Sequence, residues 1–237
     1  MSTSIVVTKL AFAETQIERF RATLGYDILT RIPLVVWLAL CAGVTMRRLM
    51  AECSAAPTLD FAETVKLLAG IGGLGFILVM AGALCLRRRP IARASGLRPR
   101  LTAIAGTFSI TALGLLPRAD LSPTAAVGSL LMICAGYALA CYALWHLGRS
   151  LSLMAEARRL VMSGPYALTR HPLYTGEALA SLGLLVQYLS PIAVVLWTAH
   201  IALQLCRMHY EEALLRRAFA EYGGYAGRVA RLIPGLY

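Results

Sequence analysis

Residues whose types and spacing could do chemistry gather in one part of the 237-residue chain, from Arg149 to Tyr237. One motif reads LVMSGPYALTRHPLYTGE over residues 160–177, and its Gly-Pro and His-Pro pairs predict a turn and then a broken approach to a helix. A second motif reads RMHYEE over residues 207–212. Arg207 and Glu211 are four residues apart, so they share a helix face. The two motifs form one site only if the fold brings them together.

The second motif suits anion binding or proton transfer. Arg207 could hold a carboxylate or phosphate through a bidentate clamp. Glu211, Glu212 and His209 are candidate bases if a reacting amine or thiol has to lose a proton. The same three residues could also mimic a metal cluster, but their spacing matches no common metal site. Taken alone, Arg207 and Glu211 would be interpreted as an ordinary surface ion pair. The catalytic roles that we expect for them rest on the family resemblance of the two motifs, and we expect no bound metal.

The composition of the chain indicates a membrane protein. Hydrophobic residues make up 58% of it and charged residues only 15%, with a mean hydropathy of +0.67. These values exclude a disordered chain and argue against an ordinary soluble one. The 23 Lys and Arg residues outnumber the 12 Asp and Glu residues, for a net charge of +11. In so apolar a chain this charge favours anionic membrane lipids as partners, and we expect no nucleic acid.

Uncharged intervals predict the membrane-spanning helices, because a span needs about 20 apolar residues and a charge at mid-bilayer is costly. Four such intervals precede Arg149, at residues 32–46, 67–86, 101–117 and 121–148. A fifth, Ala178–Cys206, would form a helix of about 43 Å at 1.5 Å per residue, which exceeds a hydrocarbon core of about 30 Å.

The fifth interval has two interpretations: one strongly tilted span, or a hairpin broken at Ser190-Pro191, where proline removes a helix hydrogen bond. A single crossing would put Arg170–Tyr174 and Arg207–Glu212 on opposite faces of the membrane, where they could not share a ligand. The hairpin returns both motifs to one side. We therefore expect the hairpin.

The loop from Arg87 to Arg100 carries six arginines and no acid. Because short cytoplasmic loops are enriched in Lys and Arg, we expect this loop, both chain termini and the segment after Gly148 on the cytoplasmic side. No cleavable signal peptide is evident before the first apolar run, which is interpreted as an anchor. These features predict a multi-pass protein of the cell inner membrane.

The remaining patterns have structural interpretations. The sequence GIGGLG at residues 70–75 spells a dinucleotide fingerprint, but it lies inside an apolar span with no acid about twenty residues later, so it predicts close helix packing. The six cysteines form no CxxC pair and are interpreted as small hydrophobic residues. Residues 10–24 indicate either an interfacial amphipathic helix or a loosely ordered tail. His146 and His200, inside apolar spans, suit substrate contact or an interhelical hydrogen bond.

The two motifs together resemble the isoprenylcysteine carboxyl methyltransferase family and its relatives among the integral-membrane phospholipid methyltransferases. The likeness covers about the last ninety residues. It consists of Leu-Val-x-x-Gly-x-Tyr, Arg-His-Pro-x-Tyr-x-Gly, an apolar hairpin, Arg-x-x-x-Glu-Glu-x-x-Leu, and then Tyr222, Tyr225, Arg228, Val229 and Ile233-Pro234. The resemblance implies S-adenosylmethionine as the cofactor, in a pocket without a Rossmann fold.

The resemblance also implies roles for particular residues. Leu160 and Val161 would contact the adenosine, Glu211 would accept a hydrogen bond from the cofactor, and Arg207 would face the substrate. The other implied cofactor-binding residues are Arg158, where the family can have a histidine, and Gly164, Tyr166, Arg170, His171, Pro172 and Tyr174. Aromatic faces suit the sulfonium cation, and Arg170 and His171 suit the carboxylate. Independently of the resemblance, we assign Glu177 and Glu212 to the substrate, although Glu177 could instead line the cofactor pocket or complement a helix N-terminus.

We therefore expect an all-α polytopic membrane protein with four transmembrane helices and a C-terminal helical hairpin at 174–206, about six spans. Residues 1–148 would form the N-terminal transmembrane region, and residues 149–237 a catalytic region with a cofactor pocket on the cytoplasmic side. The expected function is S-adenosylmethionine-dependent methyl transfer to a lipophilic acceptor from the bilayer, an isoprenylcysteine-type carboxylate or a lipid headgroup. The alternative is an NADPH-dependent, sterol-type membrane reductase, since such enzymes share the Tyr-x-Gly-Glu ending at 174–177.

Overall fold

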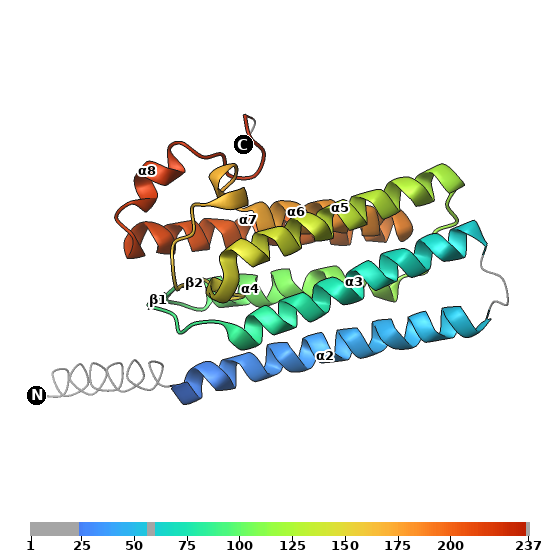
Figure 1. The fold of residues 1–237 in the computed structure, drawn as a ribbon, viewed down its shortest axis with the longest axis horizontal. Coiled ribbons are helices and arrows are strands. Elements are labelled where there is room, and N and C mark those ends of the chain that lie inside the picture. The colour runs from blue at the N-terminus through green and yellow to red at the C-terminus, as the bar shows by residue number, and fades with distance from the viewer. Residues whose placement is uncertain (1–23, 56–59, 236–237) are drawn as a thin grey trace, which may run out of the picture.

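The computed structural model describes residues 24–55 and 60–235. Long helices packed side by side make up most of this part of the chain, which confirms the all-α prediction (Figure 1). The longest helices are α2 (Leu24–Ala55), α3 (Phe61–Leu86), α5 (Pro123–Leu147) and α7 (Pro191–Ala218). All four contain stretches long and apolar enough to cross a membrane, by length and composition. The predicted amphipathic segment begins at residue 10 and lies, apart from its last residue, outside the described residues.

The region predicted as a span at residues 101–117 is not one continuous α-helix. It divides into α4 (Arg98–Ser109) and a 3₁₀ helix, η1 (Ile110–Leu115). Helical structure stops at Leu116, whose backbone is extended, with φ of −83° and ψ of 156°. Leu116 precedes Pro117, and a proline ring disfavours helical backbone in the residue before it.

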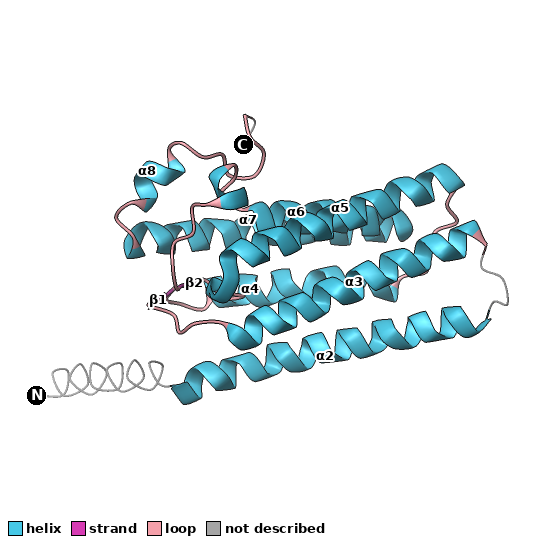
Figure 2. Cartoon of the chain, in the orientation of Figure 1, coloured by secondary structure: helices cyan, strands magenta, loops and turns pink. Residues whose placement is uncertain are grey.

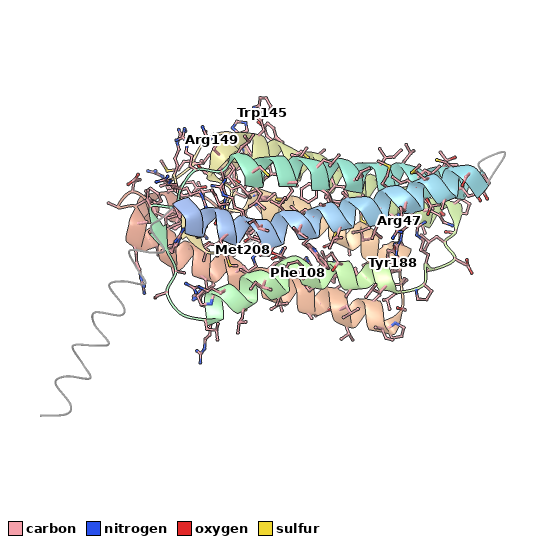
Figure 3. All side chains as sticks on the ribbon, turned by 90° about the horizontal axis from the view of Figure 1, so that it is seen from below. Arg47, Phe108, Trp145, Arg149, Tyr188 and Met208 are labelled. Carbon is pink, nitrogen blue, oxygen red and sulfur yellow. The ribbon has the colours of Figure 1, made fainter. Side chains whose placement is uncertain are left out.

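The predicted hairpin is confirmed. α6 (Pro172–Gln187) ends shortly before α7 begins, and Ser190 caps α7 by accepting a hydrogen bond from the backbone N–H of Ala193 (3.2 Å). Tyr188, in the turn, lies at the opposite end of the bundle from Arg149 (Figure 3). The first turn of α6 and the last turns of α7 therefore lie at the same end, so the two motifs are on one side of the hairpin.

Glycines allow neighbouring helices to pack with their backbones close together. A Cβ atom at Gly136 of α5 would lie 2.4 Å from the backbone nitrogen of Ala180, in α6. In α3, the GIGGLG sequence sits within the helix, and a Cβ atom at Gly70 would lie 2.8 Å from the Leu49 side chain of α2. Tight packing is thus found at Gly70, whereas a Cβ atom at Gly72 or Gly73 would make only ordinary contact with Tyr137 and one at Gly75 would meet open space. α6 packs chiefly on α5, whereas α7 packs chiefly on α4.

The end of the bundle that holds both motifs carries much of the irregular structure (Figure 2). The arginine-rich loop contributes β1 (Ala92–Arg93), which pairs antiparallel with β2 (Glu156–Ala157) between α5 and α6. The sequence analysis did not predict this pair. The short helices here are η2 (Gly148–Ser150), η3 (Gly164–Ala167) and α8 (Tyr222–Ala226).

Replacing Gly136 by alanine should destabilise the protein by about 1–3 kcal/mol, because the added methyl group meets backbone atoms that move only with α6. Gly128 in the same helix has open space at its Cβ position, so Gly128→Ala should be neutral or slightly stabilising through helix propensity. Thermal unfolding of both variants in detergent measures the difference. Equal melting temperatures would contradict the close approach of α5 and α6.

Candidate active site

A cavity lies at the motif-bearing end of the bundle. Its volume is about 890 Å³ when the solvent-filled space at its opening is included. Its walls come from the segment between α5 and α6, from the two ends of the hairpin and from α8. Most of the predicted site residues line it: Arg158, Leu160, Val161, Tyr166, Arg170, His171, Tyr174, Glu177, Arg207 and Glu211. The lining does not include Gly164, Pro172 or Glu212.

One wall is tied to the arginine-rich loop through Glu156. This carboxylate, which lines the cavity, accepts hydrogen bonds from Arg158 Nη2 (2.7 Å) and from Arg93 Nε (3.1 Å). Arg158 therefore reaches the cavity with part of its charge already balanced. The sequence analysis missed Glu156, although a signal was present: it is the only acid in residues 121–176.

Arg207 is buried where α7 meets α4. Its guanidinium donates hydrogen bonds to the side-chain oxygen of Gln204 (2.8 Å) and to the Leu153 carbonyl (3.1 Å), and its carbon lies 5.3 Å from the centroid of the Tyr174 ring. Among the described residues, no acceptor bonds its Nε atom. A Cβ atom at Gly106 of α4 would lie 2.7 Å from the Arg207 side chain, so the missing side chain makes room for this cation.

Two carboxylates flank Arg207 in the cavity. Glu211 Oε1 accepts a hydrogen bond of 2.5 Å from the hydroxyl of Tyr174, which joins the two motifs directly. Glu177 Oε2 accepts one of 3.1 Å from the amide of Gln204. Gln204 therefore links Glu177 to Arg207. The sequence analysis did not single out Gln204, although a polar residue inside an apolar interval is a signal of function.

Glu212 lies outside the cavity lining and at the centre of an ion-pair cluster. Its carboxylate lies 3.0 Å from Arg170 Nη1, 3.0 Å from His171 Nε2 and 3.1 Å from Arg231 Nε. These contacts fasten the start of α6 and the segment over residues 222–232, here called the strap, to α7. The geometry thus places Glu212 at a structural junction rather than against the space where a substrate would bind.

Backbone and tyrosine contacts complete the attachment of the strap. The Arg170 amide donates to the Ala230 carbonyl (2.8 Å), and the Tyr225 hydroxyl donates to the Tyr166 carbonyl (2.6 Å). Burial raises the pKa of Tyr222 and of Tyr225 to about 12. Both phenols therefore stay neutral across the physiological range, so their rings pack against the cavity without adding charge.

Other predicted residues shape the chain around the site. Gly164 has φ of +62°, and a Cβ atom there would collide with the His146 ring. Pro172 is buried in the first turn of α6, where its fixed φ suits a helix start. His200 makes an interhelical hydrogen bond, with its Nδ1 2.9 Å from the hydroxyl of Ser109 in α4. The six cysteines are free thiols, and no His, Cys, Asp and Glu side chains of the described residues group as a metal site.

Replacing Glu212 by glutamine should loosen the strap, because the substitution leaves buried cations without their counter-charge. We expect amide hydrogen exchange in residues 228–232 to become roughly tenfold faster or more. Glu221→Gln, at an exposed acid beside α8, is the matched control and should leave exchange unchanged. Hydrogen-exchange mass spectrometry measures both variants, and an unaltered rate in Glu212→Gln would rule out the fastening role.

Similarity to known proteins falls in the part of the chain that builds this cavity. A family model described as phospholipid methyltransferase matches residues 124–222. The chain is 35% identical over 116 residues to protein-S-isoprenylcysteine O-methyltransferase B of Arabidopsis thaliana. The aligned region covers 44% of this chain and 57% of that protein. It is 38% identical over 79 residues to the cobalt-zinc-cadmium resistance protein CzcN of Cupriavidus metallidurans, 32% of this chain and 36% of that protein.

The matched relatives are therefore covered over about half of their length or less. The matched region contains α5, the hairpin and both motifs, which are the elements that build the cavity. The resemblance inferred from the motifs is confirmed: over residues 124–222 the chain matches the phospholipid methyltransferase family model, and it is similar to an isoprenylcysteine O-methyltransferase.

Proposed function

We propose that this protein is a membrane-embedded methyltransferase that uses S-adenosylmethionine and acts on a lipophilic acceptor entering from the bilayer. The observation that carries the proposal is the shared cavity, in which Tyr166 and Tyr174 of one motif face the same space as Arg207 and Glu211 of the other. The plant relative is named an O-methyltransferase, which supports a methyl-transfer reaction.

The residues of the cavity fit the proposed methyl donor. S-adenosylmethionine would supply a methyl group on a positively charged sulfur. Arg207 already lies against the Tyr174 ring, so Tyr166 offers the aromatic face for that cation. Burial raises the pKa of the Tyr166 hydroxyl, which keeps the ring neutral. Arg159 and Arg170 line the same cavity and suit the donor's carboxylate.

The protein's own task is positioning. Methyl transfer is an in-line displacement that requires alignment of two reactants in a site that excludes water. The apolar side chains of the wall exclude water: Met80, Leu147, Leu151, Leu153, Leu160, Val161 and Leu173. Arg207, held by Gln204 and Leu153, keeps a fixed positive charge beside the reactants.

The arginine-rich loop at the cavity end supports a cytoplasmic location for the site, in the cell inner membrane. This orientation opens the cavity to the compartment where the methyl donor is made.

Cysteine labelling in whole cells tests the orientation. In a variant without the six native cysteines, Asp120→Cys should react with a membrane-impermeant maleimide, because Asp120 lies in the connection between η1 and α5 at the far end. Leu97→Cys, exposed beside the arginine-rich loop, should react only after the cells are permeabilised. The reverse pattern would contradict the proposed orientation.

Ligand binding to the purified protein in detergent tests the function. S-adenosylhomocysteine should bind and NADPH should not; tight NADPH binding without S-adenosylhomocysteine binding would favour the reductase. Tyr166→Leu should weaken binding of S-adenosylmethionine by about 2- to 30-fold, the effect expected for a lost cation–π contact, and should change S-adenosylhomocysteine affinity less. Tyr166→Phe keeps the aromatic face and serves as the control. Equal losses for both ligands in Tyr166→Leu would refute the sulfonium contact.

A further inference from the structure

One carboxylate of the cavity has no part in the donor site proposed above. Glu177 lies in α6, lines the cavity and is partly buried. Gln204 donates to its Oε2 atom (3.1 Å), and in the described part of the chain no hydrogen bond reaches its Oε1 atom. One oxygen of Glu177 is therefore available to a bound molecule.

The other candidate bases are engaged or lie elsewhere. Glu211 already accepts the Tyr174 hydroxyl, and Glu156 is paired with two arginines. Glu212 belongs to the ion-pair cluster with Arg170 and Arg231, outside the cavity lining. His209 is exposed and does not line the cavity. Of the acids that face the reaction space, Glu177 is the one best placed to take a proton.

The charges around Arg207 disfavour an anionic acceptor. Arg207 interacts electrostatically with both Glu211 and Glu177, so one buried cation faces two carboxylates. The sulfonium of a bound donor would be a second cation, so that two positive charges would face the two carboxylates. A carboxylate acceptor would add a third negative charge beside Arg207 in a site of low dielectric, where such repulsion is strong. The other arginines of the cavity are engaged: Arg158 pairs with Glu156, Arg170 pairs with Glu212, and Arg159 is assigned to the donor's carboxylate. A neutral acceptor that carries a proton keeps the site balanced.

Building on the proposed function, we infer that Glu177 is the base for a lipophilic thiol or amine acceptor, and that carboxylates are poor acceptors. A thiol gives its proton to the second oxygen of Glu177 before its sulfur attacks, whereas a neutral amine attacks through its lone pair and the ammonium so formed gives its proton to that oxygen. The acceptor's electron pair forms a bond to the methyl carbon while the carbon–sulfur bond of the sulfonium donor breaks, so the donor leaves as a neutral thioether. Glu177 then releases its proton to water.

Three acceptors dispersed in detergent test the inference: dodecanethiol, phosphatidylethanolamine and N-acetyl-S-farnesylcysteine, which offer a thiol, an amine and a carboxylate. Methyl transfer from S-adenosylmethionine should be fastest to the thiol or the amine, and comparison of those two identifies the acceptor class. Glu177→Gln should lower kcat for that acceptor by about 10²- to 10⁴-fold, the usual contribution of a general base. Its affinity for S-adenosylhomocysteine should stay within roughly twofold, which also reports correct folding.

The pH dependence separates a base from a structural role. Below the pKa of the acceptor, the rate of Glu177→Gln should rise about tenfold per pH unit, because the solvent then has to remove the proton. Glu52→Gln, which alters an acid paired with Arg118 at the far end of the bundle, is the matched control and should keep the wild-type rate and pH profile.

Faster transfer to the carboxylate than to the thiol and the amine would overturn the inference and leave the proposed function intact. So would a Glu177→Gln variant with the wild-type rate, or one whose low rate does not recover with pH. Absence of both S-adenosylhomocysteine binding and methyl transfer in the wild-type protein would overturn the proposed function itself, and with it the role of Glu177.

Discussion

The two arms of the α6–α7 hairpin are anchored to different helices, and the site depends on this arrangement. α6 packs chiefly on α5, where Gly136 brings the backbones together, and α7 packs chiefly on α4, where Gly106 makes room for Arg207. The arms pack less extensively on each other and are joined by side-chain hydrogen bonds from Trp197 to Ser181, from Gln204 to Glu177 and from Tyr174 to Glu211, which close a junction between two separately supported helices. A shift in either support would separate the halves of the site.

A polar stripe runs along α7 toward the cavity. His200, Gln204, Arg207 and Glu211 recur at helical spacing and so share one face. Unpaired polar groups are costly in an apolar bundle. Each member of the stripe is bonded to a group from outside α7, on α4, on α6 or in the segment between α5 and α6. The stripe therefore fixes the rotation of α7 and supplies the charge of the site with the same side chains.

Sequence reasoning predicted the hairpin because the two motifs had to lie on one side of the membrane to share a ligand. It missed the break at Leu116, since counting uncharged residues ignores the effect of a proline on the backbone before it. One of the two Glu156 ion pairs, that with Arg93, depends on an arginine loop far away in the chain. Glu211 and Glu212 are adjacent, yet about 100° apart around the helix, so their different roles follow only from the rotation of α7 in the bundle.

The strap at residues 222–232 imposes an order on assembly. Chains are synthesised from the N-terminal end, so α2 to α7 emerge from the ribosome before the strap does. Its bonds to the chain at residues 166–175 and the ion pair between Arg231 and Glu212 can form only afterwards. The cavity thus gains its last wall after the helices that position it are already available to the bilayer, so it is complete only once those helices can insert.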